Sequence, residues 1–227
     1  MRNSARLRSP AHASVARAAP GIGVLAGVNG AGKSSLAGVF LHQAGGEFFN
    51  PDEAAQRIRA AHPGLSQAEA NSLAWQLGLQ QLQSAVRMRH DYWFETTLGG
   101  RTITATLAAA AKAGLAVRIW YVGLDSAERC IARVAERVQR GGHAIPAELI
   151  RRRYDSSRLN LIKLLPRLAE LVVFDNSREA DPARSQCPEP AEVLHMRGGK
   201  LLGPGDLSAT PEWAKPIVAA ALKARQG

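Results

Sequence analysis

The chain has 227 residues, of which 46% are hydrophobic and 21% are charged, the composition of an ordinary globular domain with a full core. No apolar run approaches the roughly 20 residues of a membrane span, which argues against a membrane protein. The net charge of +10 suits either nucleic acid or small anionic substrates as partners. Residues 1–19 are arginine-rich without an apolar segment, so we expect a disordered basic tail rather than a secretory signal. Cys130 and Cys187 give no disulfide framework, which favours the reducing cytoplasm.

A buried strand over 21–26 is the first predicted element. The segment after it, Gly27–Ser34, reads GVNGAGKS, the full G-x-x-x-x-G-K-S pattern of a phosphate-binding loop. In such loops, backbone N–H groups surround the phosphates, a lysine (here Lys33) reaches the outer phosphates, and a hydroxyl (here Ser34) takes a position on Mg²⁺. A helix over 34–43 then points its positive dipole end at the phosphates. The order of strand, loop and helix predicts a site for ATP and Mg²⁺ rather than a glycine-rich turn that only resembles one. The predicted nucleotide contacts are Gly27, Val28, Asn29, Gly30, Ala31, Gly32, Lys33, Ser34 and Ser35.

A second short strand is predicted over 47–50, stopped by Pro51. Ligands of parallel sheets bind outside the carboxyl ends of the strands, and Asp52 lies at such an end. Its carboxylate is placed to take the proton of an attacking hydroxyl, which is the general-base role in phosphoryl transfer. The alternative is that Asp52 caps a helix beginning at Glu53.

A long helix over 66–89, begun by a capping box, leads to a third strand over 92–95. That strand runs into Glu95, Thr96 and Thr97. Glu95 is a candidate for the Mg²⁺ shell or a substrate hydroxyl, and the two threonines are candidate hydrogen-bonding groups for the substrate. No apolar run followed by Asp, as in a Walker B motif, stands beside Glu95, which makes it the acidic metal candidate by elimination. The alternative is ordinary turn chemistry at a strand end.

A helix over 103–113 and a fourth strand over 117–122 precede a helix whose start is predicted at Asp125 and Glu128. Eight arginines and no lysine lie between positions 129 and 158. Because guanidinium groups bind phosphate with two parallel hydrogen bonds, this concentration favours a phosphate clamp.

The spacing of Arg133, Arg137 and Arg140 places these side chains on one helix face. Gly141-Gly142 then breaks the helix, and a second arginine-bearing helix follows. Two such helices joined by a hinge predict a lid over 133–153 that closes on the transferring phosphate and neutralises its charge.

The other polar residues of this segment have different predicted roles. Arg140 and His143 are candidate substrate contacts, although His143 would equally suit a hinge-filling role. A solvated basic surface is the alternative for the whole segment, and we expect it for Arg129, Arg151 and Arg158.

A fifth strand is predicted over 171–174, and a hairpin over 191–202 precedes a short helix after Pro211. Strands alternating with helices predict an α/β three-layer sandwich with a mostly parallel, five-stranded sheet. The expected organisation is a single domain over 20–177, with residues 178–227 packed against it as a loop, hairpin and helix.

Four segments together resemble the zeta toxin family of P-loop kinases over about residues 20–177. They are Gly27–Ser34, the Asn50-Pro51-Asp52-Glu53 run, the Phe94-Glu95-Thr96-Thr97 run, and the arginine segment from Arg133 to Tyr154. The Gly-Gly-His-x-Ile-Pro element resembles a short chromosomal branch of the family. The chain departs from the better-characterised members at Val28-Asn29, where they carry a proline.

The resemblance implies an ATP-dependent kinase that phosphorylates the 3′-hydroxyl of the amino sugar in UDP-N-acetylglucosamine. It implies that Asp52 is the base, that Glu95 and Thr97 line the sugar site, and that Arg137 and Arg153 stabilise the transferring phosphoryl group. An inhibitory antitoxin would be a separate chain.

Two other functions fit the sequence. One is a P-loop kinase for a nucleoside, sugar or antibiotic, since a base and an arginine lid serve these acceptors equally. The other is a nucleotide-dependent nucleic-acid-binding protein, supported by the positive charge and the basic tail. Within the arginine segment Tyr154 is the one aromatic residue, which disfavours nucleic acid because stacking surfaces are scarce.

Overall fold

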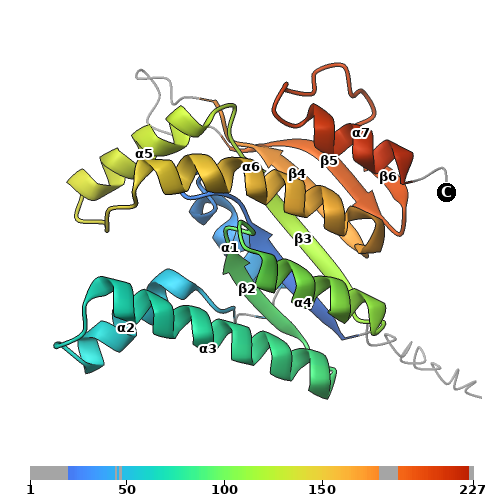
Figure 1. The fold of residues 1–227 in the computed structure, drawn as a ribbon. Helices are drawn as coiled ribbons and strands as arrows, with labels where there is room; N and C mark the ends of the chain where they lie inside the picture. Colours follow the sequence, from blue (N-terminus) through green and yellow to red (C-terminus); the bar gives the residue numbers. More distant parts are fainter. Residues whose placement is uncertain (1–19, 44, 46–47, 179–188, 225–227) are drawn as a thin grey trace, which may run out of the picture.

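The described residues form one six-stranded sheet in which an antiparallel hairpin extends four parallel strands (Figure 1). The computed structural model describes residues 20–43, 45, 48–178 and 189–224. The strand order is β2-β1-β3-β4-β5-β6, which confirms the predicted α/β sandwich with a mostly parallel sheet. The predicted C-terminal hairpin is present and continues this sheet through pairing of β5 with β4. The strands are β1 (Gly21–Ala26), β2 (Tyr92–Thr96), β3 (Ala116–Gly123), β4 (Glu170–Asp175), β5 (Ala191–Arg197) and β6 (Lys200–Gly203).

Helices cover both faces of the sheet, with α4 and α6 across the near face in Figure 1 and α1 behind it. One buried cluster joins the sheet to α3, α4, α6 and α7, and a second joins the opposite face to α1 and α5. Along β1, Val24 belongs to the first cluster and Leu25 to the second, which is why this strand is apolar at successive positions. The helices are α1 (Ser34–Gln43), α2 (Pro51–Ala61), α3 (Gln67–Met88), α4 (Arg101–Lys112), α5 (Ala127–Gln139), α6 (Ala147–Leu164), η1 (Leu165–Arg167) and α7 (Lys215–Lys223).

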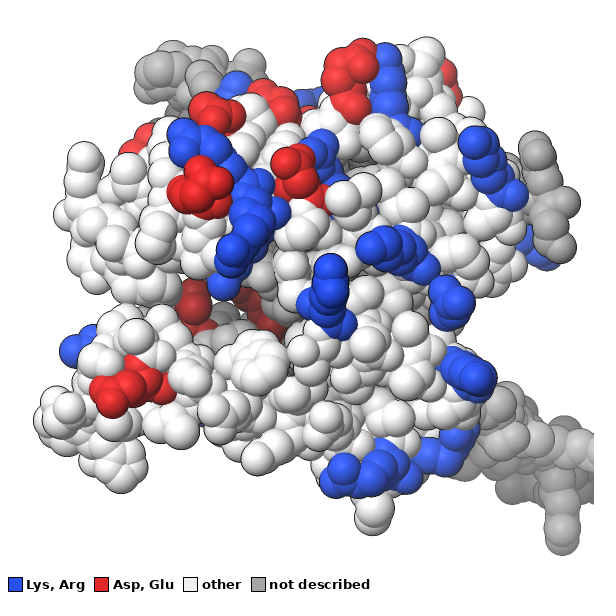
Figure 2. Space-filling model, in the orientation of Figure 1, with Lys and Arg blue, Asp and Glu red and all other residues white. Residues whose placement is uncertain are grey.

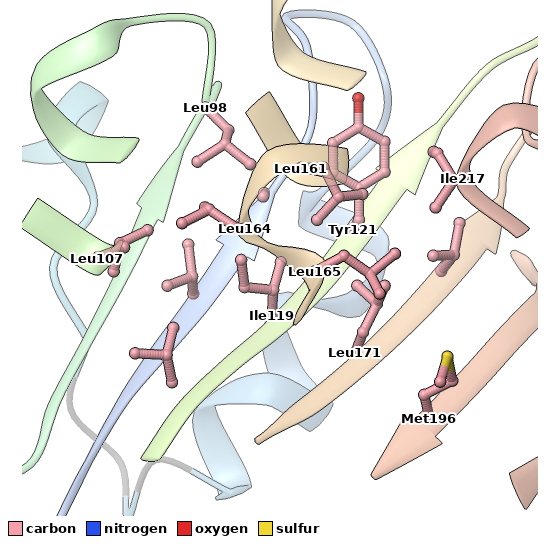
Figure 3. Packing of buried hydrophobic residues seen from close by; sticks show 14 of the residues in the cluster. Leu98, Leu107, Ile119, Tyr121, Leu161, Leu164, Leu165, Leu171, Met196 and Ile217 are labelled. Atoms are coloured by element: carbon pink, nitrogen blue, oxygen red, sulfur yellow. The ribbon is translucent and has the colours of Figure 1, made fainter. Parts of the chain in front are cut away.

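Helix α6 is fixed by its packing on the sheet. Figure 3 shows Leu161 and Leu164 of α6 over Ile119 and Tyr121 of β3, and these side chains are at most 2% exposed. Ile150 at the start of α6 is also fully buried. The helix is therefore anchored along most of its length, from Ile150 to Leu164.

The helical hairpin formed by α2 and α3 has a small core of its own. Ala54 and Ala55 pack with Ala70 and Ala74 in a cluster separate from the two main ones, with Phe49 and Ile58 beside it. Small side chains at these positions let the two helices approach closely. The hairpin stands at the β2 edge of the sheet (Figure 1).

Three local expectations differ from the structure. Of the strand predicted over 47–50, the described residues 48–50 form a single parallel bridge between Phe49 and Phe94, because Asn50 already begins the turn into α2. The helix α5 is capped by Ser126, whose hydroxyl accepts from the N–H of Arg129, and Asp125 instead pairs with the Arg129 side chain. The strand count is six rather than five because both strands of the hairpin, β5 and β6, join the sheet, whereas the segment before α2 contributes only that bridge.

Other expectations hold or lie outside the described residues. Ser66 and Glu69 form the predicted capping box at the start of α3. The basic tail over 1–19, Cys187 and most of the loop before β5 lie outside the described residues. Among the helices of the described ranges, none has the length and apolar character needed to cross a bilayer.

Candidate active site

The loop between β1 and α1 presents unpaired backbone donors to a cavity. Gly30 and Gly32 have φ values of +83° and +86°, and a Cβ on Gly32 would lie 2.1 Å from Nδ2 of Asn176. Only glycine fits there. Within the described chain, the N–H groups of Gly30, Gly32, Lys33 and Ser34 donate to no other group, and all four residues line the cavity. Such a row of donors at a helix N-terminus suits phosphate.

Lys33 lies within this loop and beside the end of β2. Its Nζ donates to the carbonyl oxygen of Gly27 at 2.7 Å and lies 3.5 Å from Oε1 of Glu95. The Lys33 side chain is only 8% exposed and that of Glu95 17%. The Lys33 ammonium therefore lies between the phosphate-binding loop and the carboxylate of Glu95, the acidic candidate from the sequence.

A cavity of about 1360 Å³ opens above the loop, between α3 on one side and α5 and the start of α6 on the other. Figure 2 shows this hollow with acidic atoms at its floor and basic side chains along its rim. The cavity brings together these predicted site residues: Asn29, Gly30, Gly32, Lys33, Ser34, Ser35, Asp52, Glu95, Thr96, Thr97, Arg137, Arg140, His143 and Arg153.

Three predicted nucleotide contacts do not line the cavity. Val28 and Ala31 are 2% and 0% exposed and pack in the core beneath the loop. The carbonyls of Gly27 and Val28 accept from Lys33, and that of Ala31 accepts from Asn176. These residues shape the loop from below, because their polar groups point inward.

Asp52 is free of the capping role that was its alternative. The cap of α2 is Asn50, whose Oδ1 accepts from the N–H of Asp52 at 2.9 Å and from that of Glu53 at 3.3 Å. Asp52 lies in the first turn of α2, and its exposed carboxylate has no ion pair or hydrogen bond within the described chain. The side chain therefore stands available at the edge of the cavity.

The segment after β2 combines the predicted turn chemistry with the predicted site. Oγ1 of Thr96 accepts from the N–H of Leu98 at 3.1 Å, and Oγ1 of Thr97 accepts from that of Gly99 at 3.4 Å. Both hydroxyls keep their own proton to donate to a ligand. Leu98 is fully buried with a φ of +53°, so this turn is held in an uncommon conformation.

Helix α6 holds this turn by three contacts. Ser156 and Ser157 donate to the carbonyls of Gly99 and Thr97 at 3.0 and 2.7 Å, and Asn160 donates to that of Leu98 at 2.9 Å. The buried Ser157 hydroxyl also accepts from the hydroxyl of Tyr121 at 3.1 Å. Side chains of α6 thus fix the geometry of the Glu95–Thr97 corner.

The arginines of α5 face the cavity, as their spacing predicted. Arg133, Arg137 and Arg140 all line it. Nη2 of Arg137 donates to the carbonyl of His143 at 3.3 Å, while its buried Nε has no partner in the described chain. Arg133 donates to the carbonyl of Asn176 at 2.9 Å.

Arg153 reaches the phosphate loop from α6. Its Nη1 donates to Oδ1 of Asn29 at 2.7 Å. Burial lowers the pKa of Arg153, the neighbouring Arg152 lowers it further, and Asp52 opposes both. Asp52 and Arg153 are thus close enough to interact. Val134 of α5 and Ile150 of α6 are both buried in the second cluster, and the lid over 133–153 remains a prediction.

Two of the three arginines expected on the solvated surface are there. Arg151 pairs with Glu128 at 3.1 Å, and Arg158 lies over the ring of Tyr154 at 4.1 Å, both outside the cavity. Arg129 differs, because it lines the cavity while it pairs with Asp125.

Residues 22–158 match the model of a family described as an AAA domain, AAA_33. The chain belongs to this AAA domain family. An uncharacterized protein of Haemophilus influenzae is 31% identical over 128 residues, which cover 56% of this chain and 88% of that protein.

Solved structures resemble this AAA domain protein in fold. The complex of AvrRxo1-ORF1 with AvrRxo1-ORF2, determined with sulphate ions and with ATP, superposes with a TM-score of 0.60 at 16% identity. The match covers 89% of this chain and 64% of that chain, so the present protein spans less than two thirds of it. A structure from the PezAT chromosomal toxin-antitoxin system of Streptococcus pneumoniae gives 0.54 at 14% identity, covering 91% of this chain and 87% of that chain.

The AAA domain protein thus has the α/β fold of P-loop NTPases, and its cavity contains residues that sequence reasoning missed. Asn176 follows the end of β4 and donates to the phosphate loop at Ala31, at 2.9 Å. Its place at the carboxyl end of a parallel strand could have marked it. Arg152, which belongs to the arginine segment but had no predicted role of its own, and Trp75, which no motif marked, also line the cavity.

Proposed function

We propose that this protein is an ATP-dependent kinase that transfers a phosphoryl group to a hydroxyl of a nucleotide sugar such as UDP-N-acetylglucosamine. The observation that carries the proposal is the position of Asp52. Its unpaired carboxylate shares one cavity with the phosphate loop and with Arg137 and Arg153. A base, a phosphate cradle and cationic groups around one space are the parts that phosphoryl transfer requires.

The unpaired N–H groups of the loop and the positive end of α1 would hold the ATP phosphates. Mg²⁺ is usually held by one or two carboxylates together with substrate phosphates, and Ser34 and Glu95 fit that arrangement. The ion would withdraw negative charge from the phosphate oxygens. Lys33 would move from the Gly27 carbonyl toward the outer phosphates, since its flexible stem begins within the cradle.

Asp52 would take the proton of the acceptor hydroxyl as that oxygen forms its bond to the terminal phosphorus. The bond from that phosphorus to the bridging oxygen breaks, and ADP leaves. Arg137 and Arg153 would neutralise the charge that spreads over the transferring oxygens. The partnerless Nε of Arg137 supports this role, because a buried donor without an acceptor is costly and a phosphate oxygen would satisfy it.

The size and charge of the cavity support an anionic acceptor. A volume of about 1360 Å³ exceeds the roughly 300–1000 Å³ of a site for one small molecule. Among its described lining residues, eight cationic side chains outnumber three carboxylates: Lys33, Arg129, Arg133, Arg137, Arg140, Arg152, Arg153 and Arg178 against Asp52, Glu95 and Glu136. This surplus exceeds what one Mg²⁺-bound ATP would neutralise, which favours a second ligand that carries phosphate.

The fold likeness to a chromosomal toxin-antitoxin system supports the further suggestion that an inhibitory protein, as a separate chain, binds over this cavity. Adding a candidate inhibitory protein to the purified enzyme would test this suggestion, since an inhibitor must reduce ATP turnover.

The test of the main proposal is transfer itself. The protein is incubated with Mg²⁺, ATP labelled in the terminal phosphate, and separate acceptors: UDP-N-acetylglucosamine, a free hexose, a nucleoside and an aminoglycoside. Mass analysis should find a phosphorylated nucleotide sugar, absent when Asp52→Asn replaces the native protein. Transfer only to a nucleoside, hexose or aminoglycoside would refute the nucleotide-sugar assignment and leave a kinase. Absence of transfer to all four would refute the proposal.

A further inference from the structure

One face of α3 forms the wall of the cavity opposite the arginines. Its lining residues recur at the spacing of a single helix face: Ala68, Asn71, Ser72 and Trp75. The other face is buried through small side chains against α2 and through larger ones against the main core. The rotation of α3 is therefore fixed, and Trp75 is held on the cavity side.

Trp75 is the large aromatic side chain of this wall and is 47% exposed. Its ring has no aromatic, guanidinium or hydrogen-bonding partner in the described chain. The three other tryptophans are partnered. Trp93 and Trp120 contact the ring of Phe40, and Nε1 of Trp213 donates to Asp175 at 2.9 Å. An exposed, unpartnered indole inside a cavity offers an apolar surface against which a ring of a ligand can pack.

The hairpin geometry places Trp75 at the same level as Asp52 along the cavity. Helices α2 and α3 are antiparallel neighbours, joined by the short connection 62–66. Asp52 precedes the middle of that connection by about as many residues as Trp75 follows it, so the two side chains stand at the same level of the hairpin. Asn71 lies one helical turn farther from Asp52.

The sheet order separates the two halves of the cavity. Asn176 and Arg178 follow β4, on one side of the phosphate loop, whereas Asp52, α3 and β2 lie on the other. The base must face the acceptor, so the side that carries Asp52 receives the acceptor and the β4 side receives the adenosine of ATP. Trp75 belongs to the acceptor side.

We propose that the indole of Trp75 is the platform on which the sugar ring of the acceptor packs, with a hydroxyl of that ring directed at Asp52. A pyranose ring presents an apolar C–H face that covers an indole, while its equatorial hydroxyls remain free to react or to bind Asn71. This inference rests on the proposed function. It adds a specificity-determining residue to the proposed acceptor site.

The kinetic test uses Trp75→Ala, Trp75→Phe and, as matched control, Leu77→Ala. Leu77 is 40% exposed on the same helix and does not line the cavity. Trp75→Ala should raise the KM for UDP-N-acetylglucosamine about 10- to 100-fold, because the free energy of burying an aromatic face is of that size. The KM for ATP should stay unchanged. Phenylalanine should restore most of the affinity and Leu77→Ala should match the native protein. An unchanged acceptor KM, or a raised ATP KM, overturns the proposal.

A binding test examines the same inference without requiring phosphoryl transfer. Quenching of tryptophan fluorescence by acrylamide reports mainly on Trp75, because the other tryptophans are more buried. With Mg²⁺ and a non-hydrolysable ATP analogue present, UDP-N-acetylglucosamine and N-acetylglucosamine 1-phosphate should protect the native protein, and UDP should not. Protection by UDP equal to that by the sugar nucleotide, or no protection by either sugar compound, overturns the role of Trp75. A protein that shows protection but no transfer refutes the kinase proposal alone.

Discussion

Replacing Arg153 by alanine should separate catalysis from stability. Arg153 donates to Asn29 at 2.7 Å, and the Asp52 carboxylate is near enough to raise its pKa. Removing a comparable electrostatic group from other enzymes lowers turnover by about 10²- to 10³-fold, equivalent to about 2.7–4 kcal/mol of transition-state stabilisation. We expect that loss in turnover, with a much smaller change in ATP binding.

The stability of the same variant should change little. A hydrogen bond to a charged group contributes about 1.5–3 kcal/mol. Burial and Arg152 lower the pKa of Arg153, so the folded protein holds this charge at an electrostatic cost, and the substitution relieves that cost. The two effects oppose each other, and we expect a net change in the free energy of unfolding of about 1 kcal/mol or less.

Single-turnover rates and urea unfolding measure the two quantities. Arg158→Ala is the matched control, since Arg158 lies on the same helix, outside the cavity, over the ring of Tyr154. It should keep native turnover. Arg153→Lys should recover only part of the rate, because an ammonium cannot make the paired contacts of a guanidinium. Turnover of Arg153→Ala within about threefold of the Arg158→Ala control would refute the clamp, as would full activity of Arg153→Lys.

Three further substitutions test the site and its support. Lys33→Ala should abolish transfer while the circular dichroism spectrum stays native, and near-normal turnover would remove the loop from the mechanism. Asp52→Asn should lower turnover about 10²-fold or more with the KM for ATP unchanged; an active variant would refute the base, since Asn50 already caps the helix. Ser157→Ala should lower the free energy of unfolding by about 1–3 kcal/mol, because the Tyr121 hydroxyl and the Thr97 carbonyl lose their partner. Urea unfolding measures it, and an unchanged midpoint would contradict it.

The elements and the phosphate loop could be predicted from sequence because their signals are local. The G-x-x-x-x-G-K-S pattern, the capping box at Ser66 and the spacing of the α5 arginines each lie within a few residues. The sequence predicts a strand over 47–50 because aromatic residues favour strands. In the structure the turn into α2 begins at Asn50 and leaves a single bridge at Phe49.

What the sequence could not supply depends on contacts between distant segments. The spacing of the arginines predicts a lid over 133–153, whereas the buried face of α6 is visible only once the sheet beneath it is known. The cap of α2 is a different case, because Asn50 and Asp52 are equally good capping residues and only the local backbone geometry separates them. Trp75 belongs to no sequence motif, and it stands out only because it lines a cavity whose other walls come from distant segments.

The separate core of the α2–α3 hairpin has a consequence for how this scaffold can diversify. The alanine cluster of the hairpin holds together the wall of the cavity that α3 forms, while the clusters on the two faces of the sheet hold the phosphate loop and α6. Substitutions on the cavity face of α3 leave all three clusters intact. A descendant could therefore exchange one acceptor for another by altering a few positions of one hairpin, while inheriting its phosphate chemistry unchanged.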